Sequence, residues 1–141
     1  ISTPSIYKKV IQLEQKGFIR GTMIKEGNMA EKAVYSLTEE GEEEFRRLMF
    51  GISSEPVHMF LDFNAVIVNL DSLSAEEQRV CLSRIGENVK TLKAYLEENI
   101  EKKEGLPEIP DTGKAVLRQQ YILIQAIETW MESMWGKIAE D

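Results

Sequence analysis

The sequence predicts a mainly α-helical protein with one small β-hairpin near its beginning. Within the first forty residues a capped helix is followed by two short apolar runs around Gly27-Asn28 and by a second cap at Thr38. In the remainder, apolar residues recur every three or four positions over long stretches, which is the period of helices packed on one face. A helix, a hairpin and a helix in this order form the back half of a winged helix, here followed by a C-terminal helical domain.

Local rules place the first helix from about Pro4 to Lys16. Ser2 or Thr3 is expected to cap its N-terminus, and Pro4 suits the first helical position, where a missing N–H costs nothing. Gly17 can adopt the left-handed conformation that ends many helices.

The two faces of this helix differ. Ile6, Val10 and Leu13 form an apolar stripe that is expected to face a core. The opposite face is polar and carries Ser5, Lys8, Lys9, Gln12 and Lys16. Hydroxyl, amide and cationic side chains suit base edges and phosphates, and a helix of this length fits the major groove of DNA. A merely solvated face is the alternative, because charged faces are ordinary on soluble helices.

The next segment favours the DNA interpretation. Residues 18–24 are rich in β-formers, residues 25–32 read as a polar loop, and residues 33–37 read as a second strand, so that together they predict a hairpin. Thr38 then caps a helix that starts at Glu39, whose acidic first turn complements the helix dipole.

In these motifs the chain resembles the PadR family of bacterial transcriptional regulators. Residues 5–19 fit the pattern Ser-Ile-Tyr-x-x-Val-x-x-Leu-Glu-x-x-Gly-x-Ile, and residues 35–41 fit Tyr-x-Leu-Thr-x-x-Gly. The likeness extends over the helical second half, although only the first forty residues carry specific motifs. It implies a winged-helix repressor that acts as a homodimer through its C-terminal helices. It also implies that Tyr7 and the polar face near it lie against the DNA backbone.

The expected DNA contacts lie on the first helix and at the wing. They are Ser2, Thr3, Ser5, Tyr7, Lys8, Lys9, Gln12, Lys16, Lys25 and Lys32. The chain departs from the family at the wing, which offers few cations beyond Lys25 and Lys32, so that insertion of this wing into the minor groove is not expected. Ile11 stands where the family often has a basic residue, which places more of the phosphate contact on Lys8, Lys9 and Lys16.

The sequence starts directly at the cap of the expected recognition helix. Two helices normally precede such a helix and cover its apolar stripe. We therefore expect the chain to be a fragment and to bind DNA more weakly than the complete protein.

Composition narrows the class of protein. Residues 1–37 carry six Lys or Arg against three Glu, and the rest carries eleven against twenty-one acidic residues, so the chain of net charge −7 is polarised. No apolar run approaches the roughly 18 residues of a membrane span. Cys81, the only cysteine, is expected to be a small buried hydrophobe, and the composition is typical of a cytoplasmic protein.

Enzymatic motifs are absent from the sequence. It has no glycine-rich phosphate loop and no nucleophile elbow, and His58 is the only histidine, so we expect no enzyme, no metal and no cofactor.

The segment after the wing is expected to join two domains, residues 1–50 and 56–141. The helix from Glu39 to about Met49 should turn Phe45, Leu48 and Met49 inward, and Gly51 to Pro56 should form the linker. Residues 57–70 are apolar on more than one face, which predicts a helix buried between others.

Two long amphipathic helices complete the chain. Ser74 and Glu77 form a capping box that opens a helix to about Lys103, and a last helix runs from about Thr112 to Ile138. Their apolar faces predict a homodimer interface formed by Leu82, Ile85, Val89, Leu92, Leu96, Leu117, Tyr121, Ile124, Ile127, Met131 and Ile138. An intramolecular helical hairpin with a dry core is the alternative.

Trp130, Met134 and Trp135 predict a site for a small aromatic effector. Flat aromatic rings and adaptable thioethers, including that of Met131, make suitable walls for a planar ligand, although core packing is the commoner use of such residues.

The sequence is compatible with two functions. The first is a DNA-binding repressor that a small aromatic effector releases. The second is a helical protein-interaction module that uses its winged-helix lobe for protein contact. Salt dependence separates them, because DNA binding weakens steeply as salt rises.

Overall fold

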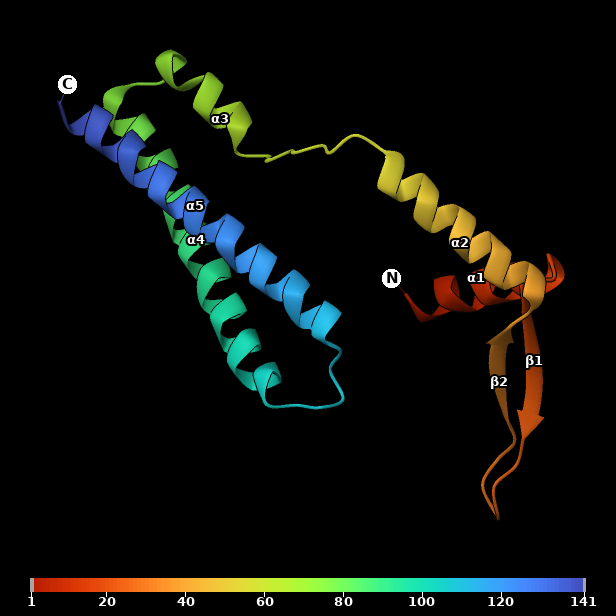
Figure 1. Cartoon of the computed structure of the whole chain (residues 1–141). Coiled ribbons are helices and arrows are strands. Elements are labelled where there is room, and N and C mark those ends of the chain that lie inside the picture. The colour runs from red at the N-terminus through yellow and green to blue at the C-terminus, as the bar shows by residue number, and fades with distance from the viewer. Residues whose placement is uncertain (1, 141) are drawn as a thin grey trace. The chain divides into compact units, whose positions relative to one another are not determined.

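The computed structural model describes residues 2–140, which form seven regular elements and one short 3₁₀ turn (Figure 1). It divides into two compact units, the winged lobe (residues 1–59) and the helical unit (residues 60–141). Among the described residues, no helix has both the length and the hydrophobicity needed to cross a membrane.

The winged lobe contains the predicted helix, hairpin and helix. Helix α1 spans Thr3–Gln15, strands β1 (Ile19–Ile24) and β2 (Lys32–Leu37) pair antiparallel, and helix α2 spans Glu39–Ser54. Gly17 takes a φ of +79° after α1 and Gly27 a φ of +58° in the hairpin loop, which are backbone conformations that glycine adopts without strain. Ser2 is the N-cap of α1, but its carbonyl oxygen rather than its side chain accepts the first amides.

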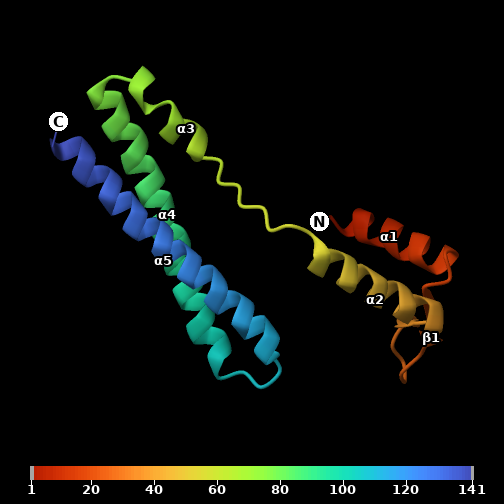
Figure 2. The same cartoon turned by 45° about the horizontal axis from the view of Figure 1, so that its top comes forward.

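The helical unit is built around two long helices. Helix α3 (Asn64–Val68) and the 3₁₀ turn η1 (Leu70–Ser72) lead into α4 (Ala75–Glu104), and α5 (Asp111–Glu140) returns antiparallel beside it (Figures 1 and 2). The capping box at the start of α4 is present in full, because Ser74 accepts from the Glu77 amide and Glu77 accepts from the Ser74 amide. The buried core consists of Leu70, Leu82, Ile85, Val89, Leu96, Ile124 and Met131.

That core changes the interpretation of the predicted dimer contacts. Six of these positions, namely Leu82, Ile85, Val89, Leu96, Ile124 and Met131, are at most 9% exposed in a single chain. Leu117, Tyr121, Ile127 and Ile138 are partly buried and pack on the same core. Because α5 folds back on α4, one chain covers these side chains, as in the intramolecular hairpin alternative. Leu92 alone among the predicted contacts is largely accessible, at 46% exposure.

The expectation of a buried helix over residues 57–70 is wrong. Residues 56–61 have no regular structure, and Val57, Met59 and Phe60 are 94, 75 and 84% exposed. Only from Asn64 does the chain become helical, where Val66 and Ile67 pack on the core of the helical unit. Phe63, directly before α3, also packs on this core, so that the continuously exposed part of the segment ends at Phe60.

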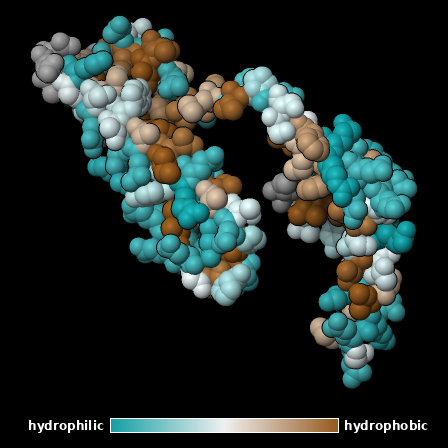
Figure 3. Space-filling model, in the orientation of Figure 1, coloured by the Kyte–Doolittle hydropathy of each residue, from teal (hydrophilic) through white to brown (hydrophobic). Residues whose placement is uncertain are grey.

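Two other apolar faces are also more exposed than predicted. Phe45, Leu48 and Met49 of α2 are 53, 45 and 44% exposed, and α2 itself runs five residues beyond the expected end at Met49. On α1, Ile6 and Leu13 are 49 and 41% exposed. No element of the described lobe covers these faces, and hydrophobic residues reach the surface of both units (Figure 3).

Candidate nucleic-acid interface

The polar face of α1 is open to solvent. Of the ten residues predicted to contact DNA, Ser5 is half-buried and the other nine are exposed, including Tyr7 at 67%. Ser5, Lys8, Gln12 and Lys16 follow one another at intervals of three and four along or just after α1, so that they share one side of the helix. None of the predicted lysines forms an ion pair with another described residue.

The wing places two further cations away from this face. Lys32 pairs with Ile24 at the distal end of the hairpin, and Lys25 follows Ile24 directly in the loop. Both lysines are exposed. The structure therefore separates the predicted residues into a group on α1 and a smaller group near the tip of the wing.

Thr38 joins the elements that orient α1. Its hydroxyl donates to the Gly17 carbonyl at 2.5 Å and accepts from the Gly41 amide at 3.1 Å. Its own amide donates to the Phe18 carbonyl at 3.1 Å. One residue thus links the end of α1, the approach to β1 and the first turn of α2.

Gly41 allows this junction to close. A Cβ at this position would lie 1.9 Å from the Phe18 carbonyl oxygen, far inside van der Waals contact. Gly41 is also the one buried residue of the described winged lobe. Its lack of a side chain lets α2 start directly against the backbone that leads into β1.

A second glycine secures the start of the wing. The Gly21 amide donates to the Glu14 carboxylate of α1 at 3.2 Å, and the ring of Tyr35, its cross-strand neighbour, lies against it. The motif Tyr35-x-Leu37-Thr38-x-x-Gly41 is therefore a positioning motif. Its residues fix the angle between α1, the wing and α2, and leave the polar face of α1 free.

Arg20 is a candidate contact that the sequence analysis missed. It is exposed on β1 and lines a surface hollow with Lys16, close to the end of α1. No periodic signal marks it, because residues 20–23 of β1 are all exposed.

Lys16 has a partner of opposite charge nearby. The pKa of Glu44 on α2 lies below its ordinary value, chiefly because Arg47 donates a hydrogen bond to it and also because the charge of Lys16 is close. Lys16 therefore contributes to the electrostatics of the winged lobe itself.

The predicted effector residues all pack on the core of the helical unit. Trp130 stacks on Phe63 with ring centroids 5.9 Å apart, and Trp135 lines a cavity. Among the described residues no cluster of His, Cys, Asp or Glu is arranged to bind a metal.

Neither a protein-family model nor a curated protein matches this chain. Solved structures do. PadR of Bacillus subtilis in complex with operator DNA superposes with a TM-score of 0.82 at 24% identity, over 98% of this chain and 80% of that chain. The same PadR in complex with p-coumaric acid superposes with a TM-score of 0.81 at 23% identity, over 100% of this chain and 78% of that chain. A PadR-like transcriptional regulator of Bacillus cereus superposes with a TM-score of 0.73 at 21% identity, over 100% of this chain and 80% of that chain.

The chain has the fold of PadR-type transcriptional regulators. The resemblance inferred from residues 5–19 and 35–41 therefore leads to the same fold as the structure does. Two of the similar structures are transcriptional regulators by name, the PadR-like protein of Bacillus cereus and PadR of Bacillus subtilis.

Proposed function

We propose that this protein is a DNA-binding transcriptional regulator that reads its operator with α1. The observation that carries the proposal is the exposed polar face of that helix, held in place by the Thr38 and Gly41 junction. The shared fold with a PadR that binds operator DNA supports it.

The residues of α1 divide into two roles in this proposal. Lys8 and Lys9, and to a smaller extent Lys16, neutralise phosphates and so supply affinity without sequence preference. Ser5 and Gln12 are short enough to donate to and accept from base edges in the major groove. Tyr7, Arg20 and the wing lysines Lys25 and Lys32 contact the backbone beside the groove.

We further propose that the protein acts as a homodimeric repressor. Apolar side chains remain accessible on the helical unit, including Leu92 and Tyr95 on α4 and Ile122 on α5, which are 46, 60 and 63% exposed. A second copy is the economical cover for them, and twofold symmetry would present two reading helices to two half-sites. The double variant Tyr95→Glu and Ile122→Glu should then sediment as a monomer, and a native chain that is already monomeric at micromolar concentration would contradict the dimer.

The DNA proposal is tested on the full chain with an operator selected from random duplexes. Lys8→Ala and Lys9→Ala should weaken binding to all sequences alike and each lower the slope of log affinity against log salt by about 1. Gln12→Ala should instead change which bases are preferred. Lys102→Ala removes the same charge from the helical unit and serves as the matched control, with no expected effect.

Binding that is independent of salt, or that is indifferent to Lys8, Lys9 and Gln12, would overturn the assignment of α1. The protein-interaction module would then be the better account. Repression is checked separately by placing the selected operator in front of a reporter gene, where added protein should lower expression.

A further inference from the structure

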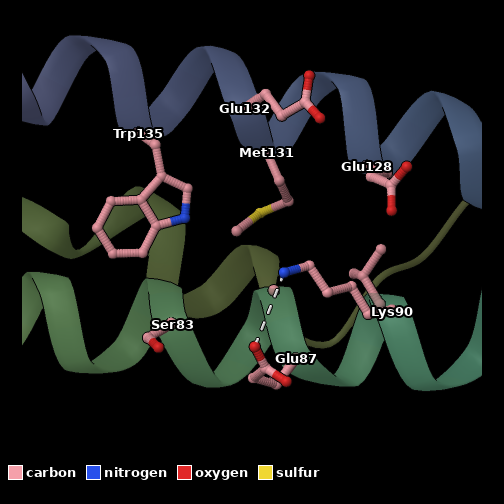
Figure 4. A pocket seen from close by; sticks show the side chains of 9 residues that line it. Ser83, Glu87, Lys90, Glu128, Met131, Glu132 and Trp135 are labelled. Atoms are coloured by element: carbon pink, nitrogen blue, oxygen red, sulfur yellow. Dashed lines mark ion pairs between the residues drawn. The ribbon is translucent and has the colours of Figure 1, made fainter.

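A cavity of about 330 Å³ opens between α4 and α5 on the helical unit (Figure 4). Its volume lies within the range of small-molecule sites. The thioether of Met131 and the indole of Trp135 reach from α5 toward α4 and form its apolar walls (Figure 4). Met131 and Val89, which also lines the cavity, are 3 and 5% exposed, so these walls belong to the packed core and are held rigidly.

The cavity stays open because of a glycine. Gly86 lines it from the middle of α4, and a Cβ added there would meet no atom within 4 Å. Glycine is a poor residue for a helix interior, where almost any side chain would stabilise the helix more. At this position the missing side chain leaves space beside Trp135 that the chain does not fill.

The charges around the opening do not cancel. Three carboxylates line it, those of Glu87, Glu128 and Glu132, against the single ammonium of Lys90. Lys93 bonds to Glu128 at 2.9 Å, whereas Lys90 and Glu87 are 3.9 Å apart and both well exposed. Glu132 has no ion pair within the described residues. The opening therefore keeps a net negative charge above an aromatic and thioether wall.

We propose that this cavity binds a small organic cation with a flat apolar body. The ring system would lie against Trp135 and Met131, and the positive charge would face Glu132 and Glu87. Indole faces and carboxylates both attract cations, and sulfur packs well on aromatic rings, so the apolar wall and the three carboxylates favour the same ligand, and only Lys90 opposes its charge. The idea that the bound cation is the effector of the regulator rests on the proposed function, whereas the binding of the cation does not.

The test compares three bicyclic compounds of similar shape by calorimetry on the full chain without DNA. They are N-methylquinolinium, which is cationic, 1-naphthalenemethanol, which is neutral, and 1-naphthoate, which is anionic. The cation should bind about tenfold more tightly than either of the others. Glu132→Gln should weaken binding of the cation severalfold and leave binding of the neutral compound unchanged. Equal or tighter binding of the anion would overturn the proposal.

A second pair of variants tests the location. Gly86→Leu fills the cavity while improving helix propensity, and should abolish binding of the cation with the fold intact by circular dichroism. Gly136→Leu makes the same change on α5 at a position that does not line the cavity and has open space around it, so binding should be retained. Undiminished binding to Gly86→Leu would place the ligand elsewhere.

The effector role is tested separately, by measuring the affinity for the selected operator in the presence and in the absence of N-methylquinolinium. Loss of operator affinity in the native chain, but not in Gly86→Leu, is expected. Cation binding that leaves operator affinity unchanged would overturn the effector role alone. Failure of all DNA binding would instead count against the proposed function and leave the binding site standing.

Discussion

The interactions that stabilise the helical unit differ from those that stabilise the winged lobe. In the helical unit seven apolar side chains are buried between or beside two long helices. In the described part of the winged lobe the only buried residue is Gly41, and the geometry is set by hydrogen bonds at Thr38 and by close approach of backbone to backbone. The helical unit thus owes its shape to hydrophobic burial, whereas the lobe owes the orientation of α1 to a few polar contacts.

The units can be followed separately in solution. Both tryptophans, Trp130 and Trp135, lie in α5, so tryptophan fluorescence reports on the helical unit. The amide signals of β1 and β2 in NMR spectra report on the winged lobe. Each substitution below is expected to act mainly on one of these two signals.

The largest effect is expected from Leu82→Ala in the helical core. Leu82 is completely buried, so its truncation removes apolar contacts and leaves a cavity, which costs about 3 to 5 kcal/mol. Denaturant unfolding followed by tryptophan fluorescence measures this loss. Val80→Ala, two residues before Leu82 in the same helix and 44% exposed, is the control and should cost about 1 kcal/mol or less. Equal costs would mean that the core does not hold the helical unit together.

Gly41→Ala should damage the winged lobe almost as severely. The new Cβ would collide with the Phe18 carbonyl, and relieving that clash by moving backbone costs about 3 kcal/mol. The β1 and β2 amide signals should shift or broaden while tryptophan fluorescence stays unchanged. Gly51→Ala, also in α2 but with open space around it, should be neutral or stabilising by up to about 1 kcal/mol. A harmless Gly41→Ala would refute the role assigned to the junction.

The two helix caps offer a finer comparison. Ser74 caps α4 by accepting from the Glu77 amide, and Ser74→Ala should cost about 1 kcal/mol. Thr38 caps α2 in the same manner but also donates to Gly17, so that Thr38→Ala should cost about 2 kcal/mol. Thr38→Ser keeps both bonds and should restore most of the stability. If the two alanine variants cost the same, the bond to Gly17 contributes nothing.

The smallest expected effect is a pH dependence at the capping box of the helical unit. Hydrogen bonds from the backbone and side chain of Ser74 hold the pKa of Glu77 below its ordinary 4.5. A carboxylate with a lowered folded pKa stabilises the folded state above its unfolded pKa, and this contribution is lost as the pH falls through the lower folded value. Unfolding measured in steps below pH 4.5 should therefore show a loss in the native chain that is reduced in Glu77→Gln. Identical pH profiles would assign the acid sensitivity to other groups.

Local signals predicted the elements that depend on local interactions. Gly17 and Gly27 adopt positive φ where turns were expected, Thr38 and Ser74 cap the helices that they were expected to cap, and the hairpin register follows the two apolar runs. The polar face of α1 was likewise readable from its spacing, because a helix of known phase determines which residues share a side. Arg20 was overlooked because a single arginine in a short strand carries no periodic signal.

The errors concern what apolar residues pack against. The apolar spacing along α4 and α5 is the same whether the partner is a second chain or the next helix of the same chain, and for Leu82, Ile85 and Val89 it is the next helix. Val57, Met59 and Phe60 have the composition of a buried helix, yet they are exposed and irregular. Periodicity shows that one face of a helix is apolar, but it does not identify the helix or chain that packs against that face.

The sequence alone therefore determined the elements of the winged lobe, the two long helices, the caps at Thr38 and Ser74, the turns, and the residues on each side of α1, because these depend on interactions within a few positions along the chain. Tertiary structure decided which apolar faces are covered, how Gly41 and Phe18 meet, and that Gly86 and Trp135 border one cavity. Those contacts join residues distant in sequence, and their free energy depends on geometry that only the folded chain defines.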